Sequence, residues 1–326
     1  MSAAPERLDA ALAFLGDRLG RDRPLGPFCT YRVGGRAARF VEVADEGELA
    51  AIARALTGVP APEVLVVGRG SNLLVTDAGF PGLVLRLGEA FETVERVEGP
   101  APEGGAVVRA GGAVALPVVA RRTVAMGLTG FEWAVGVPGS IGGAVRMNAG
   151  GHGSDMAASL LRVRVVDLAR GHDVTMPAAE LQLGYRSSAV GVAQVVAWAD
   201  LALGPGSVAA GEAELAEIVR WRREHQPGGA NAGSVFTNPE GDSAGRLIDA
   251  AGAKGLRIGT AEVSTKHANF IQADPDGSAD DVFALMVDVA RRVVARSGVR
   301  LHPETRLVGF PAFDEALDRA LREGGS

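Results

Sequence analysis

A glycine-rich segment in the middle of the chain, GVPGSIGGAVRMNAGGHG over residues 136–153, restricts the possible folds more than any other feature. Glycine has no Cβ, so the main chain can turn tightly there and a ligand can approach its N–H groups closely. Pro138 stiffens the entry to the segment. A loop that only turns tightly has the same composition, so this segment alone leaves both interpretations open.

A second glycine turn favours the ligand-binding interpretation. The segment VLVVGRGSNLLV, residues 64–75, begins as a β-branched apolar run and then passes through GRGSN at 68–72. This pattern is typical of a buried strand that leads into a phosphate-binding turn. Two such turns in one chain indicate one long ligand that carries phosphate groups.

Common nucleotide-binding and metal-binding motifs do not match the chain. The dinucleotide fingerprint G-x-G-x-x-G requires glycine at position 73, where the chain has Leu73, and this disfavours a Rossmann domain. A G-K-[ST] motif is missing from the sequence, which excludes a P-loop kinase or ATPase. The sequence also lacks H-E-x-x-H, its five histidines are scattered, and Cys29 is its single cysteine. We therefore expect no metal site and no internal disulfide.

The composition indicates a globular chain. Its 326 residues, 47% hydrophobic and 22% charged, suffice for about two domains, each with its own core. The net charge of -6 argues against nucleic-acid binding, which needs a clustered basic face. The N-terminus lacks a signal-like apolar run, and no later apolar run reaches the length of a membrane span. We expect a cytoplasmic protein without membrane insertion, and the sequence indicates no obligate protein partner.

Hydrophobic periodicity predicts an α+β fold with many short strands. Helices are expected at residues 6–20, 45–56, 117–126, 212–224 and 278–297, and strands at 40–43, 64–67, 83–87, 93–97, 106–110 and 195–203. The segment 160–176 reads as a hairpin around Arg170-Gly171-His172. Because LGPGS at 203–207 resembles a linker, we predict domains 1–206, with a core of about 30–204, and 207–326. This prediction allows the last strand and helix of the chain to pack with the first domain, although they follow the second domain in the sequence.

Three polar residues stand out as candidates for chemistry, and each also has a simpler interpretation. Arg186 offers planar, two-pronged recognition of a carboxylate or phosphate, although an isolated arginine is usually a surface ion pair. Ser234 lies between glycine and apolar residues, where an ordinary turn serine is common, and G-x-S-x-G is not matched. Glu304 precedes the predicted final strand, where an exposed glutamate is the usual outcome.

The motifs taken together resemble the UDP-N-acetylenolpyruvoylglucosamine reductase (UDP-N-acetylmuramate dehydrogenase, MurB) family. The resemblance runs from about Thr30 to Phe310 and depends on TYRVGG, VVGRGSNLLV, GVPGSIGGAVRMNAG, YRSS, AGSVFTNP, SAGRLIDAAGAKG, KHANFI and HPETRLVG. It implies an FAD-binding domain of the vanillyl-alcohol-oxidase (PCMH) type, made of two α+β subdomains, followed by a smaller α+β substrate domain. The lack of a long insertion after the arginine is similar to the second subclass, which has no tyrosine loop.

The resemblance also implies cofactor and substrate. FAD would be bound without a covalent link, NADPH would be the co-substrate, and UDP-N-acetylglucosamine enolpyruvate would be reduced to UDP-N-acetylmuramate. This reaction serves peptidoglycan synthesis, and through it cell-wall biogenesis, cell shape and cell division. The residues implied in FAD binding are Gly68, Arg69, Gly70, Ser71, Asn72, Gly136, Pro138, Gly139, Ser140, Gly142 and Gly143.

In this family pattern a hydride passes from N5 of the reduced FAD to C3 of the enolpyruvyl group. Ser234 then falls on the donor of the proton to C2, and Arg186 and Glu304 fall on the residues that hold the substrate carboxylate. Substrate contacts fall on Tyr185, Asn238 and His267. The chain departs from the usual residue at Cys29, His225, Thr237 and His302.

Two other functions fit parts of the sequence. One is an FAD oxidase or dehydrogenase for a hydroxy acid on the same flavin scaffold, in which the GSVFTNP segment would have no role. The other is a nucleotide-binding regulatory module that holds FAD as structure and consumes no NADPH.

Overall fold

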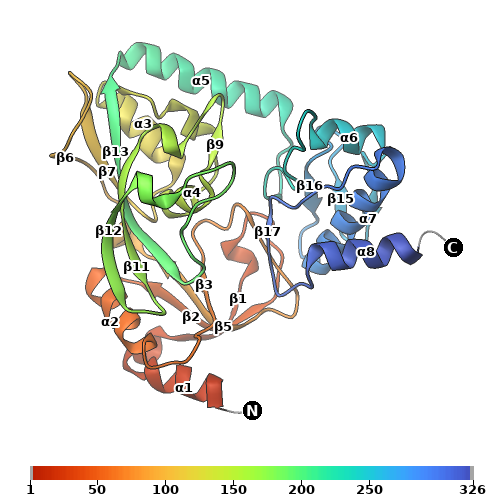
Figure 1. The fold of residues 1–326 in the computed structure, drawn as a ribbon, viewed down its shortest axis with the longest axis horizontal. Helices are drawn as coiled ribbons and strands as arrows, with labels where there is room; N and C mark the ends of the chain where they lie inside the picture. The colour runs from red at the N-terminus through yellow and green to blue at the C-terminus, as the bar shows by residue number, and fades with distance from the viewer. Residues whose placement is uncertain (1–2, 324–326) are drawn as a thin grey trace. The chain divides into compact units, whose positions relative to one another are not determined.

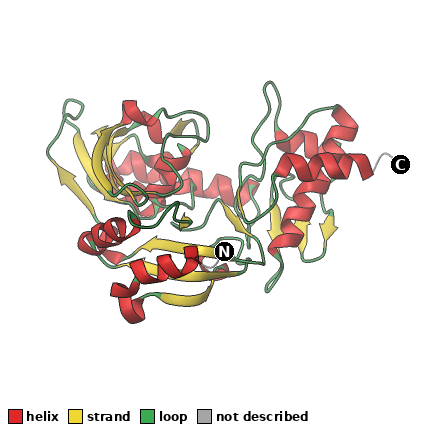
Figure 2. Ribbon diagram, turned by 60° about the horizontal axis from the view of Figure 1, so that its bottom comes forward, coloured by secondary structure: helices red, strands yellow, loops and turns green. Residues whose placement is uncertain are grey.

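The chain passes several times between two structural units (Figure 1). The computed structural model describes residues 3–323. Unit 1 consists of Met1–Arg21, Arg39–Arg69 and Pro81–Arg222, and unit 2 of Asp22–Ala38, Gly70–Phe80 and Arg223–Ser326. Helices and strands are mixed in both units (Figure 2), so the α+β prediction is confirmed.

Two sheets form the frame of unit 1. The smaller sheet has the strand order β1 (Gly20–Pro24), β2 (Arg36–Val43), β5 (Phe80–Leu87), β3 (Val64–Val66), and β3 runs parallel to β5. The larger sheet has the order β12 (His172–Pro177), β11 (Leu160–Asp167), β13 (Gln194–Pro205), β7 (Ala106–Gly111), β6 (Val94–Val97), and β8 (Leu128–Thr129) pairs with β13. The predicted hairpin is present as the antiparallel pair β11 and β12.

The helices of unit 1 bury their apolar sides in its core. They are α1 (Ala3–Ala11), α2 (Glu46–Leu56), α3 (Leu116–Ala125), α4 (Ile141–Met147) and most of α5 (Val208–His225). Helix α5 lies against α3 through Gly211 and Val124. Helix α2 begins as its sequence predicts, because Asp45 Oδ1 accepts the Glu48 N–H at 2.9 Å and Glu48 Oε2 accepts the Ala44 N–H at 2.6 Å. The short pair β9 (Gly150–Gly151) and β10 (Ser154–Asp155) closes the glycine-rich segment.

Unit 2 is built around a long helix. Helix α7 (Ala279–Ser297) starts at Ser278, whose Oγ accepts the Asp281 N–H at 3.1 Å, and ends at Gly298 with a left-handed φ of 74°. Its buried side carries Val282, Leu285, Met286, Val289 and Val293. Also present are β14 (Arg257–Ile258), β15 (Ala261–Val263), β16 (Ile271–Ala273), α6 (Ala244–Ala250) and α8 (Phe313–Glu323).

A parallel strand pair joins distant parts of the sequence within unit 2. Strand β17 (Arg306–Val308) pairs with β4 (Leu73–Val75) in the register Arg306 to Leu73. The C-terminal strand thus returns to a segment from the predicted first domain, although that segment lies in unit 2. The domain boundary at 206/207 stays a prediction.

Two local predictions are wrong. The helix expected over 6–20 ends at Ala11, and residues 13–18 form a 3-10 helix in which Gly16 has a φ of 53°. Glycine adopts this left-handed conformation readily, so the chain turns there while Leu12 and Leu15 stay buried. The expected linker at 203–207 is largely strand, because β13 extends to Pro205 and pairs there with Leu128.

None of the helices in the part of the chain that the structure describes combines the length and apolar character needed to cross a membrane.

Candidate functional site

A glycine-lined pocket lies within unit 1. It encloses about 590 Å³, counting its open mouth. Its walls come from the end of β3 and the following turn, from the turn after β7, from the start of α4 and from the start of β13. The lining residues are Val66, Val67, Gly68, Arg69, Arg86, Leu87, Gly112, Ala113, Ser140, Gly142, Gly143, Arg146, Val190, Gln194, Val195 and Val196. The two glycine turns singled out in the sequence therefore meet at one pocket.

Close backbone packing explains the glycines of this pocket. A Cβ on Gly68 would overlap Ser140 Oγ, which is buried and accepts the Gly143 N–H at 3.4 Å. The Gly142 N–H donates to the Gly112 carbonyl at 2.9 Å, and a Cβ on Gly142 would come within 3.2 Å of the same oxygen. A larger residue at Gly68 or Gly142 would therefore press against the neighbouring wall of the pocket.

The charges around the pocket suit an anionic ligand. Three arginines, Arg69, Arg86 and Arg146, line it, and no aspartate or glutamate is among its described lining residues. Arg146 Nη1 donates to the Gly191 carbonyl at 2.8 Å, which fixes the side chain at the wall. The pocket thus offers guanidinium groups and exposed backbone to phosphate oxygens.

Several predicted cofactor residues lie elsewhere. Gly136 is buried where a Cβ would meet Ile218, Arg222 and His152, and neither Pro138 nor Gly139 lines the pocket. Gly70, Ser71 and Asn72 belong to unit 2.

Asn72 has a backbone contact that the sequence did not suggest. Its Nδ2 donates to the Glu304 carbonyl at 2.9 Å, and its own carbonyl accepts the Arg306 N–H at 3.1 Å. Asn72 therefore holds the segment that carries Glu304.

Sequence reasoning missed Arg86, Gly112, Arg146 and Gln194 as pocket residues. The pair Gly111-Gly112 was the available signal, because a glycine doublet after a strand marks a close backbone approach.

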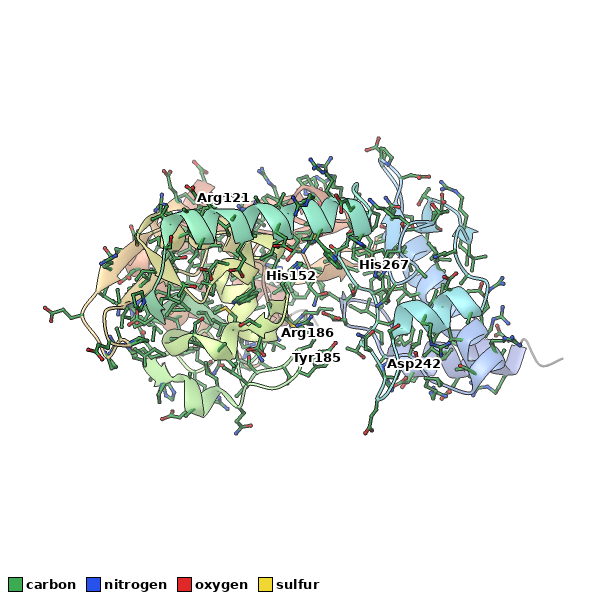
Figure 3. All side chains as sticks on the ribbon, turned by 90° about the horizontal axis from the view of Figure 1, so that it is seen from above. Arg121, His152, Tyr185, Arg186, Asp242 and His267 are labelled. Carbon is green, nitrogen blue, oxygen red and sulfur yellow. The ribbon has the colours of Figure 1, made fainter. Side chains whose placement is uncertain are left out.

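Arg186 lies at the tip of a tight turn in unit 1. Gly184 and Ser187 exchange backbone hydrogen bonds of 3.1 and 3.2 Å, so Tyr185 and Arg186 form the tip (Figure 3). Arg186 has a left-handed φ of 54°, its Nη2 donates to the Gly150 carbonyl at 3.2 Å, and its guanidinium carbon lies 5.2 Å from the centre of the Tyr185 ring.

A buried asparagine fixes this turn to the glycine-rich segment. Asn148 is 4% exposed, and its Nδ2 donates to the Gly184 carbonyl at 3.0 Å and to Asp155 Oδ2 at 3.1 Å. Its Oδ1 accepts the Ala157 N–H at 3.0 Å. Because Ser188 Oγ also donates to the Arg146 carbonyl at 2.8 Å, the arginine turn and the pocket wall form one hydrogen-bonded assembly.

Ser234 and Glu304 meet through the backbone of unit 2. The Val235 carbonyl accepts the Glu304 N–H at 2.8 Å, and Phe236 forms an antiparallel bridge with Pro303. Gly233, before the serine, has a φ of 79°, and its N–H donates to Asn231 Oδ1 at 3.0 Å. The structure thus places two candidates from distant parts of the sequence on adjacent segments, while Arg186 belongs to the other unit.

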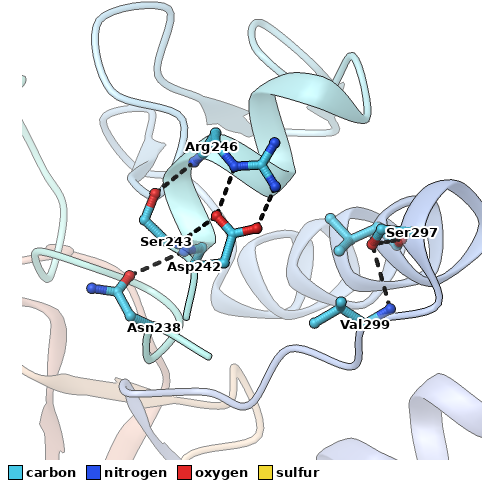
Figure 4. Close-up of polar contacts among 8 residues, drawn as sticks. Asn238, Asp242, Ser243, Arg246, Ser297 and Val299 are labelled. Atoms are coloured by element: carbon cyan, nitrogen blue, oxygen red, sulfur yellow. Dashed lines mark hydrogen bonds and ion pairs between the residues drawn. The ribbon is translucent and has the colours of Figure 1, made fainter. Parts of the chain in front are cut away.

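The predicted substrate residues of unit 2 lie near the start of α6. Asn238 Oδ1 accepts the Ala244 N–H at 3.0 Å, beside the Asp242–Arg246 ion pair (Figure 4). A Cβ on Gly245 would lie 3.5 Å from His267 Cε1, so the His267 ring lies beside the first turn of α6. Tyr185, the third predicted substrate residue, is 63% exposed in unit 1.

Burial lowers the pKa of two histidines. For His267, desolvation is the main cause and Lys254 adds a smaller effect. For His152, desolvation again comes first, followed by the charge of Arg222. Both imidazoles are therefore mainly neutral at pH 7.

Family models match the chain in two parts. Residues 37–176 match the model described as FAD binding domain, and residues 225–308 match the model described as UDP-N-acetylenolpyruvoylglucosamine reductase, C-terminal domain. The first match covers the pocket residues from Val66 to Arg146, and the second covers Ser234 and Glu304.

Curated relatives match over nearly their whole length. The chain is 43% identical to UDP-N-acetylenolpyruvoylglucosamine reductase of Paramagnetospirillum magneticum, covering 90% of this chain and 92% of that protein. It is 42% identical to UDP-N-acetylenolpyruvoylglucosamine reductase 2 of Symbiobacterium thermophilum, covering 95% and 98%. A crystal structure of UDP-N-acetylenolpyruvylglucosamine reductase from Thermus caldophilus superposes with a TM-score of 0.75 at 34% identity, covering 89% of this chain and 99% of that one.

Proposed function

The chain belongs to the UDP-N-acetylenolpyruvoylglucosamine reductase family of FAD-dependent oxidoreductases, and from that premise we propose that it uses NADPH to reduce UDP-N-acetylglucosamine enolpyruvate to UDP-N-acetylmuramate. The match over residues 225–308 supports this substrate over a hydroxy acid, because that model describes the C-terminal domain of this reductase. The proposal includes a cytoplasmic location and requires no protein partner.

The pocket of unit 1 fits the diphosphate and adjoining parts of FAD. Gly68, Gly142 and Gly143 line it without side chains, and Arg69 and Arg146 supply positive charge. When bound, FAD supplies the two-electron carrier that links the nicotinamide to the substrate. The protein's own task is to position both partners and to manage charge and protons.

The substrate gains a hydride at C3 and a proton at C2 of its enolpyruvyl group. As the hydride arrives, negative charge builds toward C2 and the carboxylate. Arg186 and Glu304 hold that carboxylate in a form able to accept the charge, and the Ser234 hydroxyl donates the proton to C2, which leaves a D-lactyl ether. Tyr185, Asn238 and His267 contact the remainder of the substrate.

One observation carries this assignment. The hydrogen bond from the Glu304 N–H to the Val235 carbonyl, 2.8 Å long, joins the segment of Glu304 to the residue that follows Ser234. A proton donor and a carboxylate-binding residue must lie this near each other, because both act on adjacent atoms of a small group.

The test is to separate the two half-reactions of Ser234→Ala by stopped-flow absorbance. Reduction of the flavin by NADPH should stay normal, because Ser234 is not needed for it. Reoxidation by the enolpyruvyl substrate should slow by roughly 10²–10⁴-fold, as is typical when a general acid is lost. Ser234→Cys should keep part of the activity, because a thiol is a stronger acid than a hydroxyl.

Ser297→Ala is the matched control. Ser297 lies at the end of α7, where its Oγ donates to the Val293 carbonyl at 2.8 Å and accepts the Val299 N–H at 3.4 Å (Figure 4). Both half-reactions of this control should match those of the wild type. Normal reoxidation in Ser234→Ala would return Ser234 to the role of a turn residue.

We also expect FAD to be held without a covalent bond. Cys29 is buried in unit 2, and burial raises the pKa of its thiol to about 12, so little reactive thiolate exists at neutral pH. Acid precipitation should release the yellow colour into the supernatant. Colour retained by the precipitate would indicate a covalent link, and His152 would be the first attachment point to examine.

A further inference from the structure

Asn269, in the loop between β15 and β16, forms hydrogen bonds with both backbone groups of Phe236, the residue two places after Ser234. Its side chain is 3% exposed. Nδ2 donates to the Phe236 carbonyl at 2.8 Å, and Oδ1 accepts the Phe236 N–H at 3.0 Å. The Asn269 carbonyl also accepts the Val235 N–H at 2.9 Å. One buried residue thus satisfies three backbone groups directly after Ser234, as a neighbouring strand would do.

The opposite edge of the same segment holds Glu304. The Val235 carbonyl accepts the Glu304 N–H at 2.8 Å, and the Thr237 N–H donates to the His302 carbonyl at 3.0 Å. Val235 and Phe236 therefore lie between Asn269 on one edge and residues 302–304 on the other. Val235 is hydrogen-bonded on both edges, and Phe236 is hydrogen-bonded to Asn269.

We infer that Asn269 is a positioning residue for the reaction, one that acts through Val235 and Phe236 to fix Ser234 and Glu304 relative to each other. The inference depends on the proposed roles of those two residues. Its physical basis is that no other hydrogen-bond partner is described for the Phe236 N–H or carbonyl, so loss of the amide leaves two buried backbone groups unpaired. The segment would shift to find water or new partners, and Ser234 would move with it.

The test combines hydrogen exchange with stopped-flow measurement on the full-length FAD-loaded protein. In Asn269→Ala, the amides of Val235, Phe236 and Glu304 should exchange at least tenfold faster than in the wild type, while those of α7 stay unchanged. Reduction by NADPH should remain within twofold of the wild type. The limiting rate of reoxidation by the enolpyruvyl substrate should fall at least tenfold, and more than the apparent dissociation constant of the substrate rises.

Two further variants keep the test decisive. Asn269→Gln retains an amide donor and acceptor on a side chain one methylene longer, so it should fold if alanine does not, and show an intermediate loss. Val293→Ala removes packing from the hydrophobic core that also contains Phe236, but it removes none of the hydrogen bonds of the segment. It should lower the melting temperature and leave the limiting reoxidation rate unchanged.

A double variant tests whether Asn269 acts through Ser234. If it does, Ser234→Ala combined with Asn269→Ala should reoxidise about as slowly as Ser234→Ala alone, because the donor is already absent. Fully multiplicative losses would overturn the inference.

The remaining outcomes separate this inference from the proposed function. A wild-type reoxidation rate in Asn269→Ala, beside a slow Ser234→Ala, overturns the inference alone. Equal losses in both half-reactions with faster exchange throughout α7 also overturn it, since that pattern is general destabilisation. Normal reoxidation in Ser234→Ala removes the proposed role of Ser234, and the inference falls with it.

Discussion

The turn that carries Arg186 in unit 1 and the segment that carries Ser234 in unit 2 both depend on a buried asparagine, yet their surroundings differ. Asn148 holds the first through the Gly184 carbonyl, and Asn269 holds the second through Phe236. Beside Arg186, Tyr185 is 63% exposed, whereas Phe236, close to Ser234, is 1% exposed.

From this difference we infer that a substitution near Ser234 affects both the reaction rate and the stability of the fold, whereas a substitution in the Arg186 turn affects mainly the rate. Phe236 belongs to the hydrophobic core of unit 2 together with Leu285 and Phe313, so a shift near Ser234 reaches that core. The Arg186 turn has exposed flanks and can change with little loss of buried contact. Variants of the turn should therefore change the reoxidation rate with little change in the free energy of unfolding. Variants near Ser234 should change both quantities.

The largest effect that sharpens this comparison is expected for Arg186→Lys. An ammonium group cannot reproduce the forked contact of a guanidinium with a carboxylate, so reoxidation by substrate should slow by roughly 10²-fold, about 2.7 kcal/mol. The free energy of unfolding should change little, because lysine and arginine have similar backbone preferences and the neighbouring residues Tyr185 and Ser187 are exposed. Stopped-flow and urea denaturation measure the two quantities.

Arg170→Lys is the control for that variant, because Arg170 lies at another turn of unit 1 and its side chain is 73% exposed. It should leave both half-reactions unchanged. A wild-type reoxidation rate in Arg186→Lys would show that Arg186 does not bind the substrate carboxylate. The comparison between the two regions would then be wrong.

A smaller effect is expected at Asn148. Asn148→Gly and Asn148→Ala both remove one of the two hydrogen bonds to the Gly184 carbonyl and leave the Ala157 N–H without its side-chain partner, which should cost about 1–3 kcal/mol of stability and slow reoxidation about tenfold. Because Asn148 has a left-handed φ of 39°, alanine should be the less stable variant; that conformation costs it roughly 1–2 kcal/mol.

Urea denaturation of the two Asn148 variants gives the order of stability, and stopped-flow gives the rates. Equal stabilities would show that backbone conformation is unimportant at this position. An unchanged reoxidation rate in both variants would mean that Asn148 does not hold the arginine turn in its reactive position.

The smallest effect concerns pH and the two histidines. Burial holds the folded-state pKa of His267 below the unfolded value of about 6.5, so the unfolded chain binds more protons there and stability falls as pH decreases through that value. His267→Asn keeps an acceptor near the Asn269 N–H and should lose less stability than the wild type between pH 7.5 and 5.5.

His152 has the same direction of shift but a more exposed ring, so His152→Asn should change the pH dependence less. Urea denaturation at the two pH values decides the order. A larger effect at His152 would contradict the view that the region near Ser234 is the more tightly packed of the two.

Much of the local structure could be predicted from the sequence. The start of α2 at Asp45, the start of α7 at Ser278 and the end of α7 at Gly298 follow from local capping, which involves residues only a few positions apart. The two glycine turns indicated one shared ligand, and parts of both turns line one pocket. The break at Gly16 escaped prediction because apolar periodicity continues through it.

The sequence by itself determined the capped helices α2 and α7, the hairpin of β11 and β12, the glycine turns and the candidates Arg186, Ser234 and Glu304, because each depends on neighbouring residues or on family motifs. Only the tertiary structure decided which backbone groups join. Asn72 and Glu304 meet across 232 positions of sequence, and Asn269 replaces a neighbouring strand beside Phe236. Such contacts form because buried N–H and carbonyl groups must be paired wherever the folded chain brings a partner, and no local pattern encodes that partner.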